Sequence, residues 1–101
     1  MMTEMDKLDA ILTERNITHT YGRRFPEIDK IIEENKIFED QDWGTQIIVY
    51  EDGVRKWDAI CGYGSYGEKE GLLEVSGNIT KKDVEGFLTA DDIIKRIDGD
   101  E

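Results

Sequence analysis

A chain of 101 residues with 38% apolar residues is long enough for one domain around a single modest core, and we expect one domain over residues 1–101. Acidic residues outnumber basic residues by 24 to 13, which gives a formal net charge of −11. This charge opposes direct binding to nucleic acid and to anionic membranes, and it favours partners that present a basic surface.

The N-terminal segment 3–15 is predicted to be a helix. Thr3 and Asp6 have the spacing of a capping box, with Asp in place of the usual Glu. Apolar residues then recur at intervals of three and four and so share one face: Met5, Leu8, Ile11 and Leu12. Asn16 is a plausible end for the helix, because Asn tolerates a left-handed backbone. The alternating segment 17–21 predicts a short strand.

The middle of the chain predicts a second helix and then a hairpin. Pro26 suits the first turn of a helix over 27–36, and a polar loop with two aromatic residues follows over 38–45. Two runs rich in β-formers, 46–50 and 54–61, are joined by a turn that contains Asp-Gly, which is a strong hairpin signal.

The C-terminal part predicts a third strand and a last helix. The run 72–76 reads as a strand that pairs antiparallel with 54–61, whereas the pattern of 79–86 is ambiguous. Thr89 is a suitable cap for a helix that ends at Gly99. We therefore predict an α+β fold in which a small antiparallel sheet of three to four strands, a β-meander, is packed by two to three helices.

Acidic residues are concentrated in the segment 27–42. If the isoleucines of the predicted helix face inward, most of its carboxylates face outward and join those of the following loop in one negative ridge. Such a ridge can imitate a phosphate backbone and occupy the basic groove of a nucleic-acid-binding protein. The residues expected to bind a partner there are Glu27, Glu33, Glu34, Glu39, Asp40 and Asp42. The simpler alternative is a solvated helix face.

A glycine-rich and tyrosine-rich loop spans 62–67 and matches the dinucleotide motif G-x-G-x-x-G literally. That motif needs a helix directly after the loop, and here glycines and acidic residues follow instead. Tyr63 and Tyr66 are amphipathic residues of the kind that anchor protein interfaces, so we consider them a second partner-binding surface. Internal packing of both tyrosines is the alternative.

Evidence for catalysis or metal binding is weak. Cys61 and His19 are the only residues of their kinds, and together they cannot form a zinc site without carboxylate ligands. We expect Cys61 to be a buried, unreactive thiol, and we expect Asp58 to face solvent or pair with a neighbouring basic side chain. We therefore predict no catalytic residues, no metal site and no cofactor, and a protein that is not an enzyme.

The segment 46–97 resembles a family of small proteins of phages and prophages of Firmicutes. The resemblance is carried by W-D-A-I-C at 57–61, by G-S-Y-G-E-K-E-G-L-L-E-V-S-G at 64–77 and by V-E-G-F-L-T-A-D-D-I-I-K-R-I at 84–97. It implies a phage setting, and no functional residue is transferred from it.

These observations lead to a leading hypothesis and one alternative. We expect a small acidic phage-type protein of the host cytoplasm that binds and inhibits a host nucleic-acid-handling protein, such as a CRISPR effector, by imitating DNA. The cytoplasm is expected because the chain has one cysteine and no signal-peptide pattern at its start. The alternative is a module that binds or sequesters a nucleotide or another small molecule at the loop 62–67. A homodimer is left open.

Overall fold

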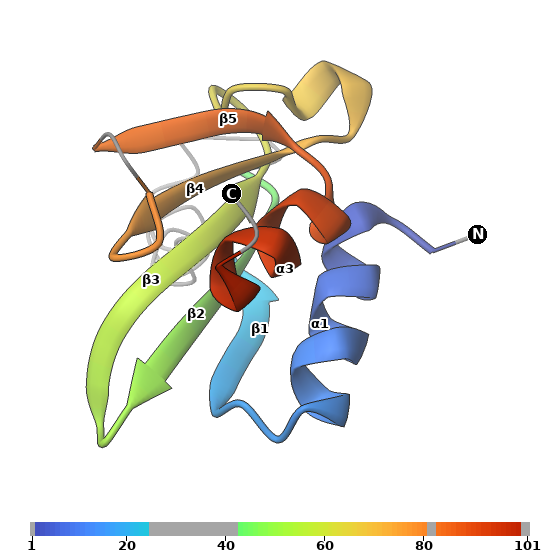
Figure 1. Ribbon diagram of the computed structural model, residues 1–101. Helices are drawn as coiled ribbons and strands as arrows, with labels where there is room; N and C mark the ends of the chain where they lie inside the picture. Colours follow the sequence, from blue (N-terminus) through green and yellow to red (C-terminus); the bar gives the residue numbers. More distant parts are fainter. Residues whose placement is uncertain (1, 25–42, 81–82, 100–101) are drawn as a thin grey trace, which may run out of the picture.

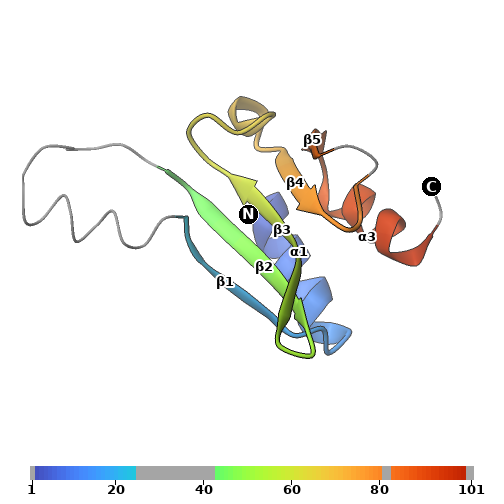
Figure 2. The same ribbon diagram turned by 90° about the vertical axis from the view of Figure 1, so that its left-hand side faces the viewer.

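The computed structural model describes residues 2–24, 43–80 and 83–99 of the chain. Two α-helices lie side by side on one face of a five-stranded sheet (Figure 1), and Figure 2 shows both helices on the same side of that sheet. In chain order the elements are α1 (Glu4–Glu14), β1 (His19–Arg23), β2 (Thr45–Glu51), β3 (Val54–Cys61), the short 3₁₀ helix η1 (Glu68–Glu70), β4 (Leu73–Gly77), β5 (Val84–Leu88) and α3 (Ala90–Asp98).

The strands lie in the sheet in the order of the chain, β1-β2-β3-β4-β5, and all neighbours are antiparallel. The α+β class is thus confirmed, but the predicted count of three to four strands is wrong, because the sheet has five. The sheet extends by one short strand at each edge. β1 corresponds to the predicted short strand 17–21, and β5 lies in and just beyond the ambiguous segment 79–86. Edge strands have only one neighbour and are partly exposed, which weakens the alternation that identifies a strand.

The predicted hairpin is confirmed as β2 and β3. Asp52 and Gly53 both have a left-handed backbone, with φ of 53° and 78°, as a tight turn between twisted strands requires. On β3, Trp57 and Ala59 are buried toward the helices, and Cys61, on the same face, packs against the edge of this core. Cys61 is only half-buried, whereas a buried thiol was expected.

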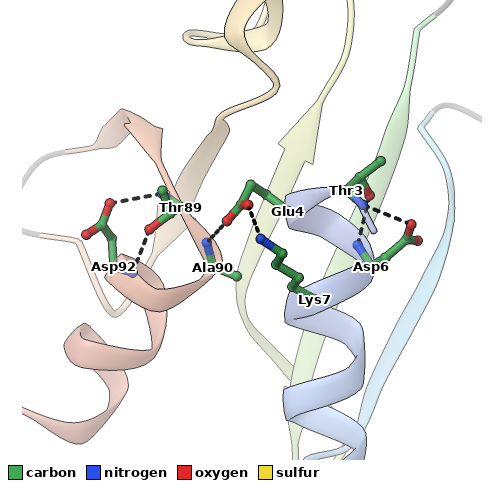
Figure 3. Close-up of polar contacts among 7 residues, drawn as sticks. All are labelled: Thr3, Glu4, Asp6, Lys7, Thr89, Ala90 and Asp92. Carbon is green, nitrogen blue, oxygen red and sulfur yellow. Dashed lines mark hydrogen bonds and ion pairs between the residues drawn. The ribbon is translucent and has the colours of Figure 1, made fainter. Parts of the chain in front are cut away.

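Both helices begin with a capping box, as Figure 3 shows. In α1, the Asp6 amide donates to the Thr3 hydroxyl at 3.0 Å and the Thr3 amide donates to the Asp6 carboxylate at 3.2 Å. Thr89 and Asp92 make the same pair of bonds at the start of α3. The short side chain of Asp therefore replaces Glu in the box at both helices, as the spacing in α1 predicted.

Glu4 joins the two helices at their N-terminal ends. Its carboxylate accepts a hydrogen bond of 2.8 Å from the amide of Ala90, in the first turn of α3, and a second one of 3.0 Å from Lys7 (Figure 3). The bond from Ala90 is the main reason that the pKa of Glu4 is lowered below 4.5. At the other end, Arg15 and Asp98 form a two-pronged ion pair between the helices, with contacts of 2.6 and 3.1 Å.

The core lies between the helices and the central strands. Its largest fully buried side chains come from both helices and from the sheet: Leu8 and Leu12 of α1, Ile47 of β2, Leu73 and Val75 of β4, and Ile93 of α3. The predicted apolar face of α1 is therefore confirmed, and these contacts fix both helices against the sheet.

Two further predictions fall on residues outside those that the structure describes. They are the helix over 27–36 and most of the loop over 38–45, which together carry the predicted acidic ridge. Among the described residues, no helix has the length and apolar character needed to span a membrane.

Candidate functional site

Three exposed aromatic side chains gather at the end of the sheet where β3 finishes. Tyr63, Tyr66 and Phe87 are 55%, 62% and 58% exposed, respectively, and all three line one open depression of about 480 Å³. The other lining residues belong to the same loop and to η1, and we call the whole site the aromatic depression: Tyr63, Gly64, Ser65, Tyr66, Gly67, Glu68, Lys69, Glu70 and Phe87. Figure 1 shows this part of the chain, in yellow to gold, at the end of the sheet beside β5.

The loop is folded around a buried serine. The Ser65 hydroxyl donates to the carbonyl of Gly62 at 2.8 Å and accepts from the amide of Gly62 at 3.0 Å. The Ser65 amide also donates to the carbonyl of Gly62, at 2.9 Å. These three bonds close a tight turn in which Tyr63 is directed outward, so the polar side chain of the loop is buried while its aromatic side chain is exposed.

Four neighbouring segments hold the loop in place. Arg24, just after β1, donates to the carbonyl of Tyr63 at 2.8 Å. The ring of Trp43, just before β2, meets the ring of Tyr63 edge-on, with centroids 5.7 Å apart. Glu74 of β4 accepts from the amide of Tyr66 at 3.0 Å, and Phe87 of β5 donates its amide to the carbonyl of Tyr66 at 3.3 Å. The loop is therefore a fixed support for its aromatic side chains.

Two glycines allow the chain to approach closely enough for these contacts. A Cβ atom on Gly62 would lie 2.0 Å from the carbonyl oxygen of Trp43, and one on Gly86 would lie 2.3 Å from the Cβ of Tyr66. Both distances are far below van der Waals contact, so any side chain at either position would push the loop away from its support.

Phe87 reaches the site through an irregularity in β5. Leu88 lies opposite Leu73, and Glu85 lies opposite Val75, so β5 has one more residue than β4 between these pairs. This extra residue makes a β-bulge, and Phe87 has a left-handed backbone within it, with φ of 58°. Phe87 was not predicted as a site residue, because nothing in the pattern of 79–86 reveals the bulge that turns this side chain toward the loop.

The dinucleotide motif at 62–67 lacks the helix that a dinucleotide site requires. After Gly67 the chain forms only the three-residue η1 and then enters β4, so no long helix points its N-terminus at the loop. Glu68 and Glu70 line the aromatic depression, and their carboxylates would repel a phosphate group. The prediction that no α-helix follows the loop directly is therefore confirmed.

The residues considered for catalysis do not meet. His19 lies opposite Val49, which pairs with Trp57, whereas Cys61 lies four residues farther along β3. At about 3.3 Å per residue the two side chains are roughly 13 Å apart along the strands, too far for a nucleophile and its base. His19 instead contacts Asp9 of α1 at 2.7 Å and the carbonyl of Ile17 at 2.6 Å.

Asp58 is held by its neighbours. It accepts a hydrogen bond of 2.9 Å from Gln46 and forms an ion pair of 3.3 Å with Arg55, which confirms the expected basic partner. Among the described residues, no group of three or more His, Cys, Asp or Glu side chains is arranged to hold a metal ion.

A larger depression of about 720 Å³ lies at the opposite end of the sheet, near the turn between β2 and β3. Its apolar floor includes Val49 and Trp57, which are only 6% and 5% exposed because they belong to the core. Its lining also includes side chains of both charges: Glu51, Asp52, Lys56 and Arg96. It therefore offers a partner far less exposed aromatic surface than the aromatic depression does.

The structure thus describes two of the eight residues predicted to bind a partner, Tyr63 and Tyr66, and shows both exposed on one surface. The other six, Glu27, Glu33, Glu34, Glu39, Asp40 and Asp42, lie outside the described residues. No protein-family model matches the chain, and no curated protein or solved structure matches it significantly. The function is therefore inferred from the geometry of the site and the charge of the chain.

Proposed function

We propose that this chain is a protein-binding module that docks onto a basic surface of another protein through the aromatic depression. The observation that carries the proposal is the grouping of three exposed aromatic side chains around one depression. Aromatic residues are enriched among the side chains that contribute most binding energy, because they bury a large area at little cost in side-chain entropy.

The backbone of Phe87 supports the same conclusion. Among the described non-glycine residues, only Asn16, Asp52 and Phe87 have positive φ, and the first two lie in turns, where Asn and Asp tolerate it. A left-handed backbone costs a bulky residue roughly 1–2 kcal/mol. Phe87 bears this cost although it is 58% exposed and lies outside the buried core. Strain of this kind is found preferentially at functional sites.

The charge of the chain supports a basic partner. The net charge of −11 raises the rate of encounter with a positively charged protein surface and disfavours acidic partners. Proteins that handle nucleic acids present such surfaces. In the phage setting implied by the resemblance, the partner would be a host nucleic-acid-handling protein, such as a CRISPR effector, whose groove the chain would occupy in place of DNA.

The test is affinity capture of host proteins on the immobilised chain, with three variants compared side by side. Tyr66→Ser and Phe87→Ser remove exposed aromatic side chains of the depression, and Val54→Ser removes an equally exposed apolar side chain, 57% exposed, on the hairpin. We expect a basic partner that is retained at low salt, is released by added salt, and is lost with the first two variants only. Equal capture by all three variants would contradict the proposal.

The acidic segment 27–42 is the rival surface, and a separate variant tests it. Reversing five of its carboxylates to lysine should abolish capture if this segment imitates DNA: Glu33, Glu34, Glu39, Asp40 and Asp42. Loss of capture with this variant alone, and not with Tyr66→Ser or Phe87→Ser, would assign binding to the acidic segment.

A panel of nucleotides tests the small-molecule alternative. A ligand that binds only the folded chain raises its melting temperature. Because Glu68 and Glu70 line the aromatic depression, we expect no such rise. A rise that Tyr66→Ser abolishes would replace a protein partner with a nucleotide.

A further inference from the structure

The aromatic depression combines two chemical features that together select one kind of side chain. Tyr63, Tyr66 and Phe87 provide aromatic rings, whose faces carry partial negative charge. Glu68 and Glu70 provide carboxylates in the same lining. Rings and carboxylates both attract a cation that is only partly hydrated, and neither favours an anion.

Resting on the proposed function, we infer that the aromatic depression receives an arginine side chain of the partner. A guanidinium is planar, so it can stack on an aromatic ring while its N–H groups reach a carboxylate in the same plane. It is also less strongly hydrated than the ammonium of lysine, which makes its transfer to an aromatic surface less costly. The excess of negative charge on the chain acts in the same direction.

Three other charged side chains lie at or near the site, and only Lys69 opposes an incoming arginine. The Arg24 guanidinium is bonded to the carbonyl of Tyr63 from outside the lining. The Glu74 carboxylate already accepts a hydrogen bond from the amide of Tyr66, and this bond holds the loop. Lys69 is a cation within the lining and would compete with an incoming arginine. Replacing Lys69 with Gln is therefore expected to strengthen binding.

The probe is the capped tripeptide Gly-Arg-Gly, compared with the same peptide in which citrulline replaces arginine. Citrulline has nearly the same shape and no charge, so the pair isolates the cation. Amide NMR spectra of the whole chain should show shifts confined to 63–70 and to Phe87, and the arginine peptide should bind roughly fivefold more tightly than the citrulline peptide. Equal affinity of the two peptides, or shifts spread over other surfaces, would overturn the inference.

Variants separate the aromatic and ionic contributions. Phe87→Leu keeps an apolar side chain in the same strained position but removes the ring, and Glu68→Gln with Glu70→Gln removes the charge. Each change removes only part of the attraction, so each is expected to lower the preference for arginine over citrulline from about fivefold to roughly twofold. Glu14→Gln, on the exposed last turn of α1, is the control for loss of an acidic residue. This variant should leave the preference for arginine over citrulline unchanged. A full preference in all variants would contradict the inference.

The two proposals fail in distinguishable ways. If capture of a basic protein depends on Tyr66 and Phe87 but arginine and citrulline peptides bind equally, the protein-binding function stands and the arginine site is refuted. If the arginine peptide is preferred but no captured protein depends on these aromatic side chains, the cation site stands and the proposed function is refuted.

Discussion

The aromatic depression requires a residue without a side chain at Gly86 of β5, because Tyr66 packs directly against this position. A Cβ atom there would lie 2.3 Å from the Cβ of Tyr66 and 3.1 Å from its carbonyl oxygen. Carbon atoms pack best at roughly 3.5–4.0 Å, so Gly86→Ala must move the loop and β5 apart by roughly 1.2 Å or more. The hydrogen bond from Phe87 to Tyr66, already 3.3 Å long, would be broken.

Gly22 of β1 provides the matched control. Both glycines lie in edge strands without a left-handed backbone, and a Cβ on Gly22 has no atom within 4 Å among the neighbours described. Alanine at either site reduces the conformational entropy of the unfolded chain by a similar amount. The difference between the two variants therefore isolates the clash, which we expect to lower the free energy of unfolding by about 1–3 kcal/mol for Gly86→Ala relative to Gly22→Ala.

The measurement is urea denaturation of both variants, followed by the fluorescence of the tryptophans, together with amide NMR spectra. The buried Trp57 reports on the core, and the resonances of Tyr66 and Phe87 report on the loop. Equal unfolding free energies for the two variants, or unchanged loop resonances in Gly86→Ala, would refute the view that this contact supports the site.

Three further predictions concern stability and its dependence on pH. Glu4→Gln should lower the unfolding free energy by about 0.5–1.5 kcal/mol at neutral pH, because it removes the charge that accepts the Ala90 amide. Folding lowers the pKa of Glu4 from 4.5. The difference in unfolding free energy between this variant and the parent chain should therefore persist above pH 4.5 and disappear as the pH falls through the folded-state pKa. Urea titrations at several pH values measure this difference. Leu8→Ala opens a cavity at a fully buried site and should cost about 2–5 kcal/mol in the same assay, and a cost below 1 kcal/mol would contradict this packing. Phe87→Gly relieves the left-handed strain, so it should leave the unfolding free energy unchanged or raise it by up to about 1 kcal/mol. The same variant should weaken partner capture. A large loss of stability would show instead that Phe87 serves the fold.

Local sequence signals were sufficient for the elements that depend on nearby residues. Thr3 with Asp6 predicted a capping box, and Thr89 predicted the start of the last helix, because a cap is formed by side chains within three residues of the backbone groups that they satisfy. Asp52 and Gly53 predicted the central hairpin for a similar reason, since the turn needs two residues that accept positive φ.

Long-range pairing decided the extent of the sheet. The short strand near 17–21 was recognised, but its pairing with β2 spans the segment 25–42 and leaves no local trace in the sequence. β5 was ambiguous because one extra residue interrupts its alternation, and a bulge is defined only by the partner strand opposite it. The predicted three or four strands became five for these two reasons.

The sequence alone determined that the chain is strongly acidic, that its N-terminal helix is amphipathic, and that a loop carrying Tyr63 and Tyr66 follows the hairpin. Whether these tyrosines pack inside or face outward depended on the tertiary structure. Contacts from four segments fix the loop. The bulge of β5 brings Phe87, which follows Tyr66 by 21 positions in the chain, to the same depression. Charge is a sum over residues and can be read from the sequence, whereas a binding surface needs side chains that only the folded backbone brings together.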